Sequence, residues 1–273
     1  MSSLDCAVIQ LCSTPDVEAN LKAADLYVGQ AARAGARFVA LPENAAFLRT
    51  EPSMPAPTQS LEGSIVGAFR EMASRHGVWL LVGSFPEARP EDHRYYNTSV
   101  VIDGTQSGAP ITCTYRKLHL FDIDMKGGES QKESDWIAPG ERPVVADIAG
   151  TPIGLSICYD LRFPELYRRL TDGGARALTV PSAFTEHTGK DHWLILLRAR
   201  AIENQSFVIA PNQFGHHGGK RRSYGKSAII DPWGVPLAIA PDRPGWALAR
   251  IDLDHQDLIR EALPCLSHRN ANV

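Results

Sequence analysis

The chain has 273 residues, of which 44% are hydrophobic and 22% are charged, and it carries a formal net charge of −3. This composition is that of a globular protein with a substantial core, and the weak acidity excludes the strong positive charge by which proteins attract nucleic acids or anionic membranes. No stretch reaches the roughly 18 consecutive apolar residues that a membrane-spanning helix needs, so we expect neither a membrane nor a nucleic acid as a partner.

Predicted strands and helices alternate in the first half of the chain. Apolar and amphipathic runs predict, in order, a strand at 5–11, a helix at 17–34, a strand at 37–41, a helix at 61–76 and a strand at 78–85. Gly35 and Gly77 close the two helices, in the position where glycine commonly ends a helix. Residues 95–103 and 111–118 then predict a hairpin, and residues 126–134 a polar, glycine-rich loop.

The same alternation returns in the second half. After a strand that leads into Cys158, the pattern predicts a helix ending at Gly173 and Gly174, a strand at 177–183, a helix at 192–204 and strands at 207–212 and 225–230. This favours the α/β class, with a mixed sheet and helices outside it. Because no repeat, linker or change of composition divides the chain, we expect one domain over residues 1–273. Its tail from about residue 252 reads as a terminal helix or as a helix that docks on a partner subunit.

Cys158 lies at the junction between a predicted strand and a predicted helix. Apolar and small residues alternate before it, as in a buried strand, and Pro164 and Glu165 are typical of the first turn of a helix. A thiol between a strand end and a helix N-terminus lies where the thiolate is stabilised and where substrate can reach it. Taken alone, Cys158 could also be an ordinary core cysteine.

The cysteines as a set indicate neither a zinc site nor a disulfide framework, because none forms a C-x-x-C pair; they are Cys6, Cys12, Cys113, Cys158 and Cys265. The first ten residues read as a strand, since they lack the basic region and long apolar run of a signal peptide. We therefore expect a reducing, cytoplasmic location.

Two further predicted strand ends carry unusual polar residues. Glu43 follows the apolar run Val-Ala-Leu-Pro, and Lys117 is flanked by apolar residues on the predicted hairpin. Ligands bind at the carboxyl ends of strands in open α/β sheets, so a base, a cation and a thiol converging there would form a compact acyl-transfer site. Taken singly, Glu43 also fits a solvated loop carboxylate or a helix cap, and Lys117 a surface lysine.

Three segments resemble the catalytic blocks of the nitrilase, or carbon–nitrogen hydrolase, superfamily, and they occur in that family's order. They are Leu-Pro-Glu-Asn at 41–44, Tyr-Arg-Lys-Leu-His-Leu-Phe-Asp at 115–122 and Cys-Tyr-Asp-Leu-Arg-Phe-Pro-Glu-Leu at 158–166. The resemblance extends from the first predicted strand to about Gly234. It implies a four-layer α-β-β-α sandwich of mixed sheets with helices outside.

The resemblance also implies a Glu-Lys-Cys triad. It assigns the general base to Glu43, the lysine to Lys117 and the nucleophile to Cys158. The family's second glutamate falls in the loop before the cysteine strand, where Glu133 fits best and Glu129 is the alternative.

The chemistry of such a triad follows from the weakness of an amide as an electrophile. Glu43 would take the proton of the Cys158 thiol, and the thiolate would attack the carbonyl carbon. Lys117 and the backbone N–H of Tyr159 would bind the developing oxyanion. Glu43 would then protonate departing ammonia, leaving a thioester that water hydrolyses. Glu133 would position Lys117 or the water, and neither a metal nor an organic cofactor is required.

A finer resemblance links three later segments, at 182–193, 197–204 and 220–227, to the Nit subgroup of this superfamily. It implies an amidase that hydrolyses the amide of a small 2-oxo acid, with deaminated glutathione as the expected substrate. An ω-amidase acting on α-ketoglutaramate, a nitrilase and a carbamoylase are the alternatives within the superfamily. Lys226 departs from the pattern, because the subgroup tends to have histidine there.

Several residues are candidates for holding the substrate, and the expected binding set is Tyr159, Arg162, Phe184, Thr188 and Arg221. Arg162 and the basic loop 215–222 could grip carboxylates, since arginine offers bidentate hydrogen bonds, although such a loop is also typical of a mobile solvated segment. The histidines match no compact ligand spacing, so we predict no metal; they are His187, His192, His216 and His217.

Two other classes of protein fit the sequence less well. A non-catalytic binding protein on the same fold would be expected to lack the triad, and a papain-like protease would have different neighbours around its cysteine. The family resemblance further implies a homodimer or a higher homo-oligomer, built through helices next to the active-site region.

Overall fold

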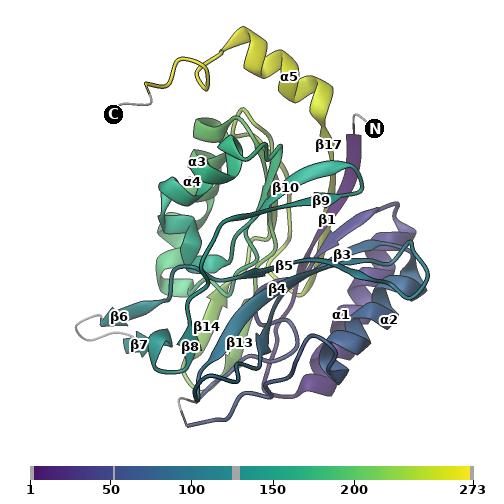
Figure 1. The fold of residues 1–273 in the computed structure, drawn as a ribbon, viewed down its shortest axis with the longest axis vertical. Helices are drawn as coiled ribbons and strands as arrows, with labels where there is room; N and C mark the ends of the chain where they lie inside the picture. Colours follow the sequence, from purple (N-terminus) through teal and green to yellow (C-terminus); the bar gives the residue numbers. More distant parts are fainter. Residues whose placement is uncertain (1–2, 52, 125–129, 271–273) are drawn as a thin grey trace.

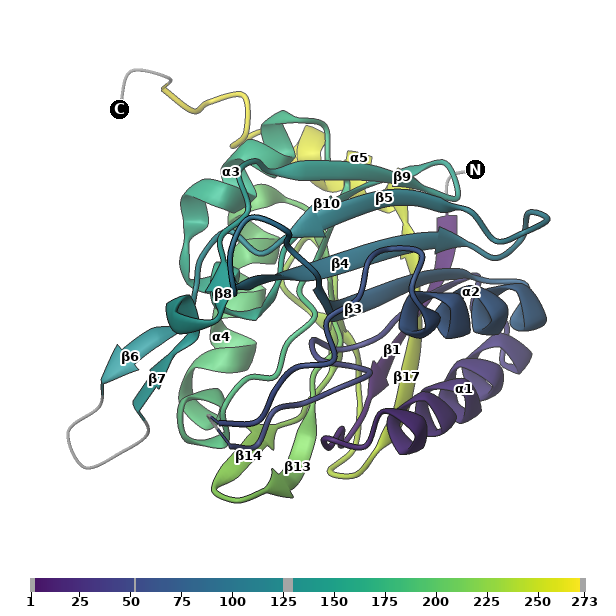
Figure 2. The same ribbon diagram turned by 60° about the horizontal axis from the view of Figure 1, so that its bottom comes forward.

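The computed structural model describes residues 3–51, 53–124 and 130–270, and in them two β-sheets pack face to face with helices on both outer sides (Figures 1 and 2). The first sheet has the order β17-β1-β2-β3-β4-β5, and β8 pairs with β4. Its strands are β1 (Ser3–Gln10), β2 (Phe38–Ala40), β3 (Trp79–Glu87), β4 (Tyr95–Asp103), β5 (Ile111–Arg116), β8 (Ile137–Ala138) and β17 (Gly245–Asp252).

The second sheet has the order β16-β15-β12-β11-β10-β9. Its strands are β9 (Val144–Ile148), β10 (Thr151–Leu155), β11 (Ala177–Thr179), β12 (Phe207–Ala210), β15 (Ala228–Ile230) and β16 (Pro236–Ile239). Both sheets are mixed: β1, β2 and β3 are parallel in one, β10, β11 and β12 are parallel in the other, and antiparallel strands complete each. The expected mixed α/β architecture is therefore confirmed.

Helices cover the outer face of each sheet. On the first sheet lie α1 (Val17–Arg33) and α2 (Ser64–His76), and on the second α3 (Pro164–Asp172) and α4 (Glu186–Asn204). Three apolar clusters fill the spaces between the layers, one under each helix pair and one between the sheets. The layers follow the order α-β-β-α that the family resemblance implies.

Strand β1 shows why the sequence is apolar at successive positions. Ala7 and Ile9 pack in the cluster under α1 and α2, whereas Cys6 and Val8 face the other sheet. A sheet that is covered on both faces needs apolar residues on both, so its strands read as continuous apolar runs. The predicted strand 5–11 is therefore a strand buried on both sides.

The chain begins α4 six residues earlier than the helix predicted from residue 192. The reason is a tertiary contact: a Cβ on Gly189 would lie 2.3 Å from Cβ of Tyr224, so only glycine lets the strand β14 (Arg221–Tyr224) approach this turn. Residues 186–191 are polar and look like a loop in the sequence. Their packing partner Tyr224 lies far along the chain, so the local pattern does not indicate a helix there.

Two segments expected as loops contain hairpins. Residues 215–222 fall largely in the pair formed by β14 and β13 (Phe214–Gly218), so their assignment as a loop is wrong. Within the expected loop 126–134, β7 (Ser130–Lys132) pairs with β6 (Asp122–Asp124) and is followed by the 3-10 helix η1 (Glu133–Asp135). Figure 2 shows the β6–β7 hairpin projecting from the body of the molecule.

The tail predicted from about residue 252 contains the helix α5 (Leu253–Ala262), which lies beyond the end of the second sheet (Figure 1). It contacts its own chain: the Gln256 amide donates to the carbonyls of Arg176 at 2.9 Å and Gln205 at 2.7 Å, and Ile259 is buried. Leu258 stays 63% exposed.

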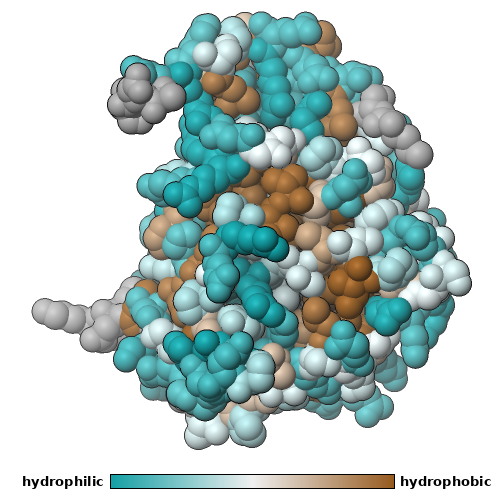
Figure 3. All heavy atoms as spheres, viewed as in Figure 1, coloured by the Kyte–Doolittle hydropathy of each residue, from teal (hydrophilic) through white to brown (hydrophobic). Residues whose placement is uncertain are grey.

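None of the helices in the described ranges is long and apolar enough to cross a bilayer. On the face drawn in Figure 3, polar side chains predominate, and apolar ones show in patches, one over the middle of the molecule near β10 and another on the side where β3 lies.

Gly83 in β3 allows a close approach that positions the loop after β2. A Cβ at this residue would lie 2.1 Å from the carbonyl oxygen of Leu41 and 2.3 Å from that of Pro42. We predict that Gly83→Ala lowers the free energy of unfolding by about 1–3 kcal/mol in urea denaturation, as overpacking usually does.

The matched control is Gly67→Ala in α2, where an added Cβ meets no atom within 4 Å. This variant should be neutral or more stable by up to about 1 kcal/mol, because alanine is the better helix former. Equal stability of the two variants would contradict the prediction.

Candidate active site

Glu43 lies three residues beyond β2, with its carboxylate buried at the seam between the two sheets. Oε1 accepts hydrogen bonds from Asn97 Nδ2 at 2.9 Å and from Lys117 Nζ at 3.0 Å. Oε2 accepts one from the backbone N–H of Ala183 at 2.9 Å. Asn97 belongs to the first sheet and Ala183 follows β11 of the second, so this carboxylate joins both halves of the molecule.

Lys117 directly follows β5, and its side chain is only 1% exposed. Nζ donates to Glu43 and to both carboxylate oxygens of Glu133, at 3.1 and 2.9 Å. Glu133 Oε2 also accepts from the backbone N–H of Phe121 at 2.8 Å, which ties the segment after Lys117 to η1. A buried ammonium is tolerated only when it is paired and hydrogen-bonded in this way.

Cys158 begins the 3-10 helix η2 (Cys158–Arg162), three residues after β10. Its φ of +48° lies in the left-handed region, which residues other than glycine rarely adopt. The backbone N–H of Cys158 donates to the carbonyl of Pro181 at 2.9 Å and holds this turn. The next amide, that of Tyr159, finds no acceptor in the part of the chain that the structure describes, so it is available to a ligand.

The electrostatics of this cluster favour a thiol over a thiolate at rest. Burial and the Glu43 carboxylate raise the pKa of Cys158, and the charge of Lys117 offsets this only in part. Burial also raises the pKa of Glu43, but Lys117 and the hydrogen bonds from Cys158 and Ala183 outweigh it and lower the pKa overall. Both effects favour the thiol form of Cys158 over the thiolate, so the site pairs a thiol with a carboxylate.

Asp160 connects the turn of Cys158 to the strand of Lys117. Oδ2 accepts from the Tyr115 hydroxyl at 2.7 Å and from the backbone N–H of Ile157 at 2.9 Å. Oδ1 accepts from the backbone N–H of His119 at 3.0 Å and lies 2.7 Å from its Nδ1. Since Tyr115 and His119 flank Lys117, this fully buried carboxylate fixes the lysine and the thiol relative to each other.

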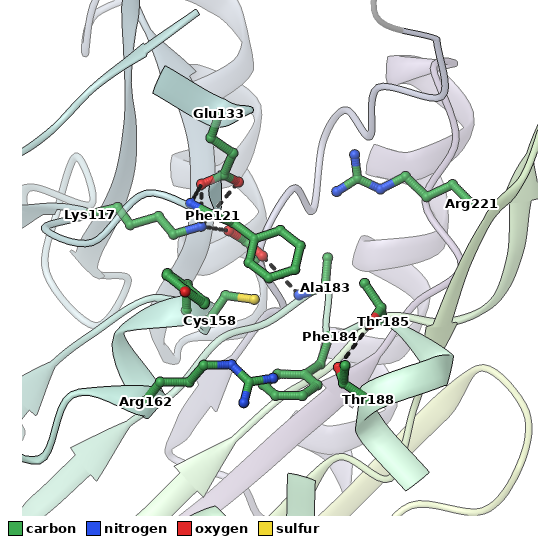
Figure 4. A pocket seen from close by; sticks show the side chains of 12 residues that line it. Lys117, Phe121, Glu133, Cys158, Arg162, Ala183, Phe184, Thr185, Thr188 and Arg221 are labelled. Atoms are coloured by element: carbon green, nitrogen blue, oxygen red, sulfur yellow. Dashed lines mark hydrogen bonds and ion pairs between the residues drawn. The ribbon is translucent and has the colours of Figure 1, made fainter. Parts of the chain in front are cut away.

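A pocket of about 360 Å³ opens over this cluster (Figure 4). Its walls contain every residue proposed from the sequence for catalysis or binding, namely Glu43, Lys117, Glu133, Cys158, Tyr159, Arg162, Phe184, Thr188 and Arg221. Figure 4 shows Arg162 beside Cys158 and Phe184, and Arg221 across the opening from Lys117 and Glu133. A concave site lined by a few convergent polar groups suits a small molecule.

The sequence analysis missed four residues that shape the site. Phe121, Ala183 and Thr185 also line the pocket, and Asn97 hydrogen-bonds to Glu43 from behind. Phe121 and Ala183 act through backbone amides, for which the identity of a side chain gives no signal. The amide side chain of Asn97 within an apolar strand was a signal that could have been used. The alternative second glutamate, Glu129, lies outside the described residues.

Of the basic segment 215–222, only Arg221 lines the pocket among the residues described. Arg222 pairs with Glu186 of α4 at 2.6 Å, and the His217 ring is buried between the Ser13 carbonyl and the Ser223 hydroxyl. Burial lowers the pKa of His217 to about 4, so it adds no positive charge at neutral pH.

Two further expectations concern residues away from the pocket. Lys226 pairs with Asp242 at 2.8 Å, so its departure from the subgroup pattern does not change the pocket wall. Within the described ranges, no three His, Cys, Asp or Glu side chains gather in a way that could hold a metal ion.

The fold and this site define a class of enzyme. The carbon–nitrogen hydrolase family matches residues 6–261, and the chain belongs to that family. It is accordingly an enzyme that hydrolyses carbon–nitrogen bonds, and its relatives show it to be an amidase of the nitrilase superfamily.

Among those relatives are proteins named deaminated glutathione amidase. The one from Synechocystis sp. (strain PCC 6803 / GT-S) is 42% identical over 266 residues, which cover 96% of this chain and 97% of that protein. The one from Homo sapiens is 41% identical over 275 residues, which cover 98% of this chain and 82% of that protein. The crystal structure of the C. elegans NitFhit protein superposes with a TM-score of 0.91 at 36% identity, covering all of this chain and 66% of that one.

Asp160→Asn replaces one carboxylate oxygen by an NH2 group, which donates hydrogen bonds and does not accept them. Because each oxygen of Asp160 accepts from a backbone N–H, the new NH2 group would face another donor. An unsatisfied buried group costs about 1–3 kcal/mol. We predict that amidase kcat falls by about tenfold or more, since the variant displaces Lys117 and Cys158, which Asp160 holds together.

The control is Asp147→Asn on β9, whose exposed carboxylate caps the amide of Gly150 at 2.8 Å. It should keep wild-type kcat and KM. If Asp160→Asn also kept them, the positioning role of Asp160 would be refuted.

Proposed function

We propose that the chain is a thiol amidase that hydrolyses the amide of a small 2-oxo acid, with deaminated glutathione as its substrate. The observation that carries this proposal is the buried Lys117 ammonium held between Glu43 and Glu133 beside the Cys158 thiol at the base of the pocket. The substrate is inferred from the names of the relatives that are about 40% identical over nearly the whole chain.

Acylation begins with proton transfer. Glu43, ionised because its pKa is lowered, accepts the proton of Cys158, and the sulfur attacks the carbonyl carbon. The oxyanion forms where the Lys117 ammonium and the free amide of Tyr159 can donate to it, and one such donor typically contributes about 2.7–4 kcal/mol. Glu133 keeps Lys117 in place and protonated, since the two carboxylates hold the pKa of Lys117 well above its usual range.

Acylation ends when Glu43 gives its proton to the leaving amine, the C–N bond breaks and a thioester remains on Cys158. In deacylation, Glu43 removes a proton from water, and the water oxygen attacks the thioester carbonyl carbon. The C–S bond then breaks, the acid leaves, and Glu43 returns the proton to the sulfur of Cys158.

The leaving group depends on the kind of amide. The first amide of deaminated glutathione is secondary, so its hydrolysis releases the dipeptide cysteinylglycine and 2-oxoglutarate. The ammonia expected at the sequence level accompanies only primary amides such as α-ketoglutaramate.

The proposal extends to the setting of the enzyme. All five cysteines are free thiols, in keeping with a reducing compartment, and we place the protein in the cytoplasm. The whole chain acts as one hydrolase domain, because the pocket takes residues from both sheets.

The substrate proposal predicts turnover of deaminated glutathione with release of 2-oxoglutarate and a free amine, at a kcat/KM at least about tenfold above that for α-ketoglutaramate. Both reactions release 2-oxoglutarate, so chromatography of cysteinylglycine and an ammonia assay separate them. Cys158→Ala should abolish both, whereas Cys113→Ala, at a half-buried cysteine outside the pocket, should keep them. Faster cleavage of α-ketoglutaramate would establish the ω-amidase alternative instead.

The proposed assembly is a homodimer or a higher homo-oligomer. Exposed apolar side chains on α4, the helix that begins beside the pocket, support this assembly. Ile195 and Ile202 of α4 are 68% and 49% exposed, and neighbouring Trp233 is 58% exposed. Burying such side chains favours association. We predict an oligomer in sedimentation velocity and a shift toward monomer in Ile195→Glu/Ile202→Glu. A monomeric wild-type chain at micromolar concentration would disprove the proposed assembly.

A further inference from the structure

The charges around the nucleophile do not cancel. Lys117 lies between Glu43 and Glu133, so this cluster carries one more negative charge than positive. An anionic substrate is repelled by such a cluster unless cations on the other walls offset it. The pocket has two further charged side chains, and both are arginines, Arg162 and Arg221.

Neither arginine contacts a carboxylate in the residues that the structure describes. Arg162 lies 5.1 Å from the Phe184 ring centre, and its Nη1 lies 3.4 Å from His192 Nδ1. Arg221 donates from Nη1 to the carbonyl oxygen of Arg49 at 3.2 Å. Most of the five N–H donors of each guanidinium therefore stay available to a ligand.

Arg49 supports Arg221 through its backbone, because its carbonyl oxygen accepts the hydrogen bond from Arg221 Nη1. The Arg49 guanidinium carbon lies 4.9 Å from the Trp136 ring centre and 5.8 Å from that of Tyr95, and the buried Nε has no hydrogen-bond partner in the described chain. Stacking on two rings holds Arg49 in place. The carbonyl that orients Arg221 is therefore held in place as well.

The two arginines enter the pocket from different sides. Arg162 belongs to the same 3-10 helix as Cys158, whereas Arg221 comes from the β13–β14 hairpin and lies across the opening (Figure 4). A substrate with one anionic group on each side of the scissile amide matches this arrangement.

We propose that Arg221, supported by Arg49, forms a second carboxylate subsite that binds the far carboxylate of the leaving group, while Arg162 binds the acyl-side carboxylate. The inference rests on the proposed function, because deaminated glutathione carries one carboxylate on each side of the scissile amide. The two carboxylate subsites together make the enzyme selective for doubly anionic amides.

A cycle of two enzymes and two substrates tests this subsite. Wild type and Arg221→Gln are compared on deaminated glutathione and on its analogue with a C-terminal carboxamide, which differs by the loss of one charge. We expect the carboxamide to lower the wild-type kcat/KM by about tenfold or more, mainly through KM. Arg221→Gln should lose a similar factor on the acid and less than about threefold on the carboxamide.

Arg222→Gln is the matched control, because it removes the same charge from the next residue of β14, whose side chain pairs with Glu186 outside the pocket. Its kcat/KM should equal that of the wild type on both substrates. Equal losses by Arg221→Gln on the acid and the carboxamide, or a wild type that does not distinguish them, would overturn the subsite. A wild type that cleaves neither compound would instead overturn the proposed function, and the subsite with it.

Discussion

The burial of the Lys117 ammonium is the constraint on which the site depends. A charge withdrawn from water requires partners of opposite sign within hydrogen-bonding distance. Glu43 supplies one from the loop after β2, and Glu133 supplies two oxygens from η1. Meeting this requirement brings the Glu43 carboxylate and the Lys117 ammonium together beside the Cys158 thiol. The same interactions leave one negative charge in excess among the three charged groups, and the two arginines of the pocket, Arg162 and Arg221, carry the opposite sign.

The packing of the two sheets turns these local requirements into one geometry. Glu43 accepts a hydrogen bond from the Ala183 amide on the opposite sheet, and Asp160 links the turn of Cys158 to the strand of Lys117. Apolar side chains of both sheets fill the layer between them and exclude water from the seam. A small displacement between the sheets would therefore separate the Glu43 carboxylate from the Ala183 amide. The positive φ of Cys158 is maintained by this same set of contacts.

The elements that sequence reasoning identified correctly are those with a local signal. The strands around residues 5–11 and 78–85 and the helices ending at Gly35 and Gly77 carry apolar periodicity and glycine ends. The early start of α4 and the β13–β14 hairpin were missed, because Gly189 and Tyr224, which pack closely in the fold, lie far apart along the chain. His217 illustrates the same limit: it resembles a pocket cation in sequence, but burial keeps it neutral.

The sequence by itself determined the α/β class. Through its resemblance to a family it also indicated Glu43, Lys117 and Cys158 as the candidate triad, Glu133 as the preferred second glutamate and the Tyr159 amide as an oxyanion donor. Such candidates can be recognised because each reaction step needs a particular functional group. Only the tertiary structure decided that burial raises the pKa of Cys158 and that the backbone amides of Phe121 and Ala183 donate to the two glutamates. It also decided that Arg221 lines the pocket while Arg222 does not. Burial, amide direction and distance between remote residues arise from packing, and no residue type encodes them locally.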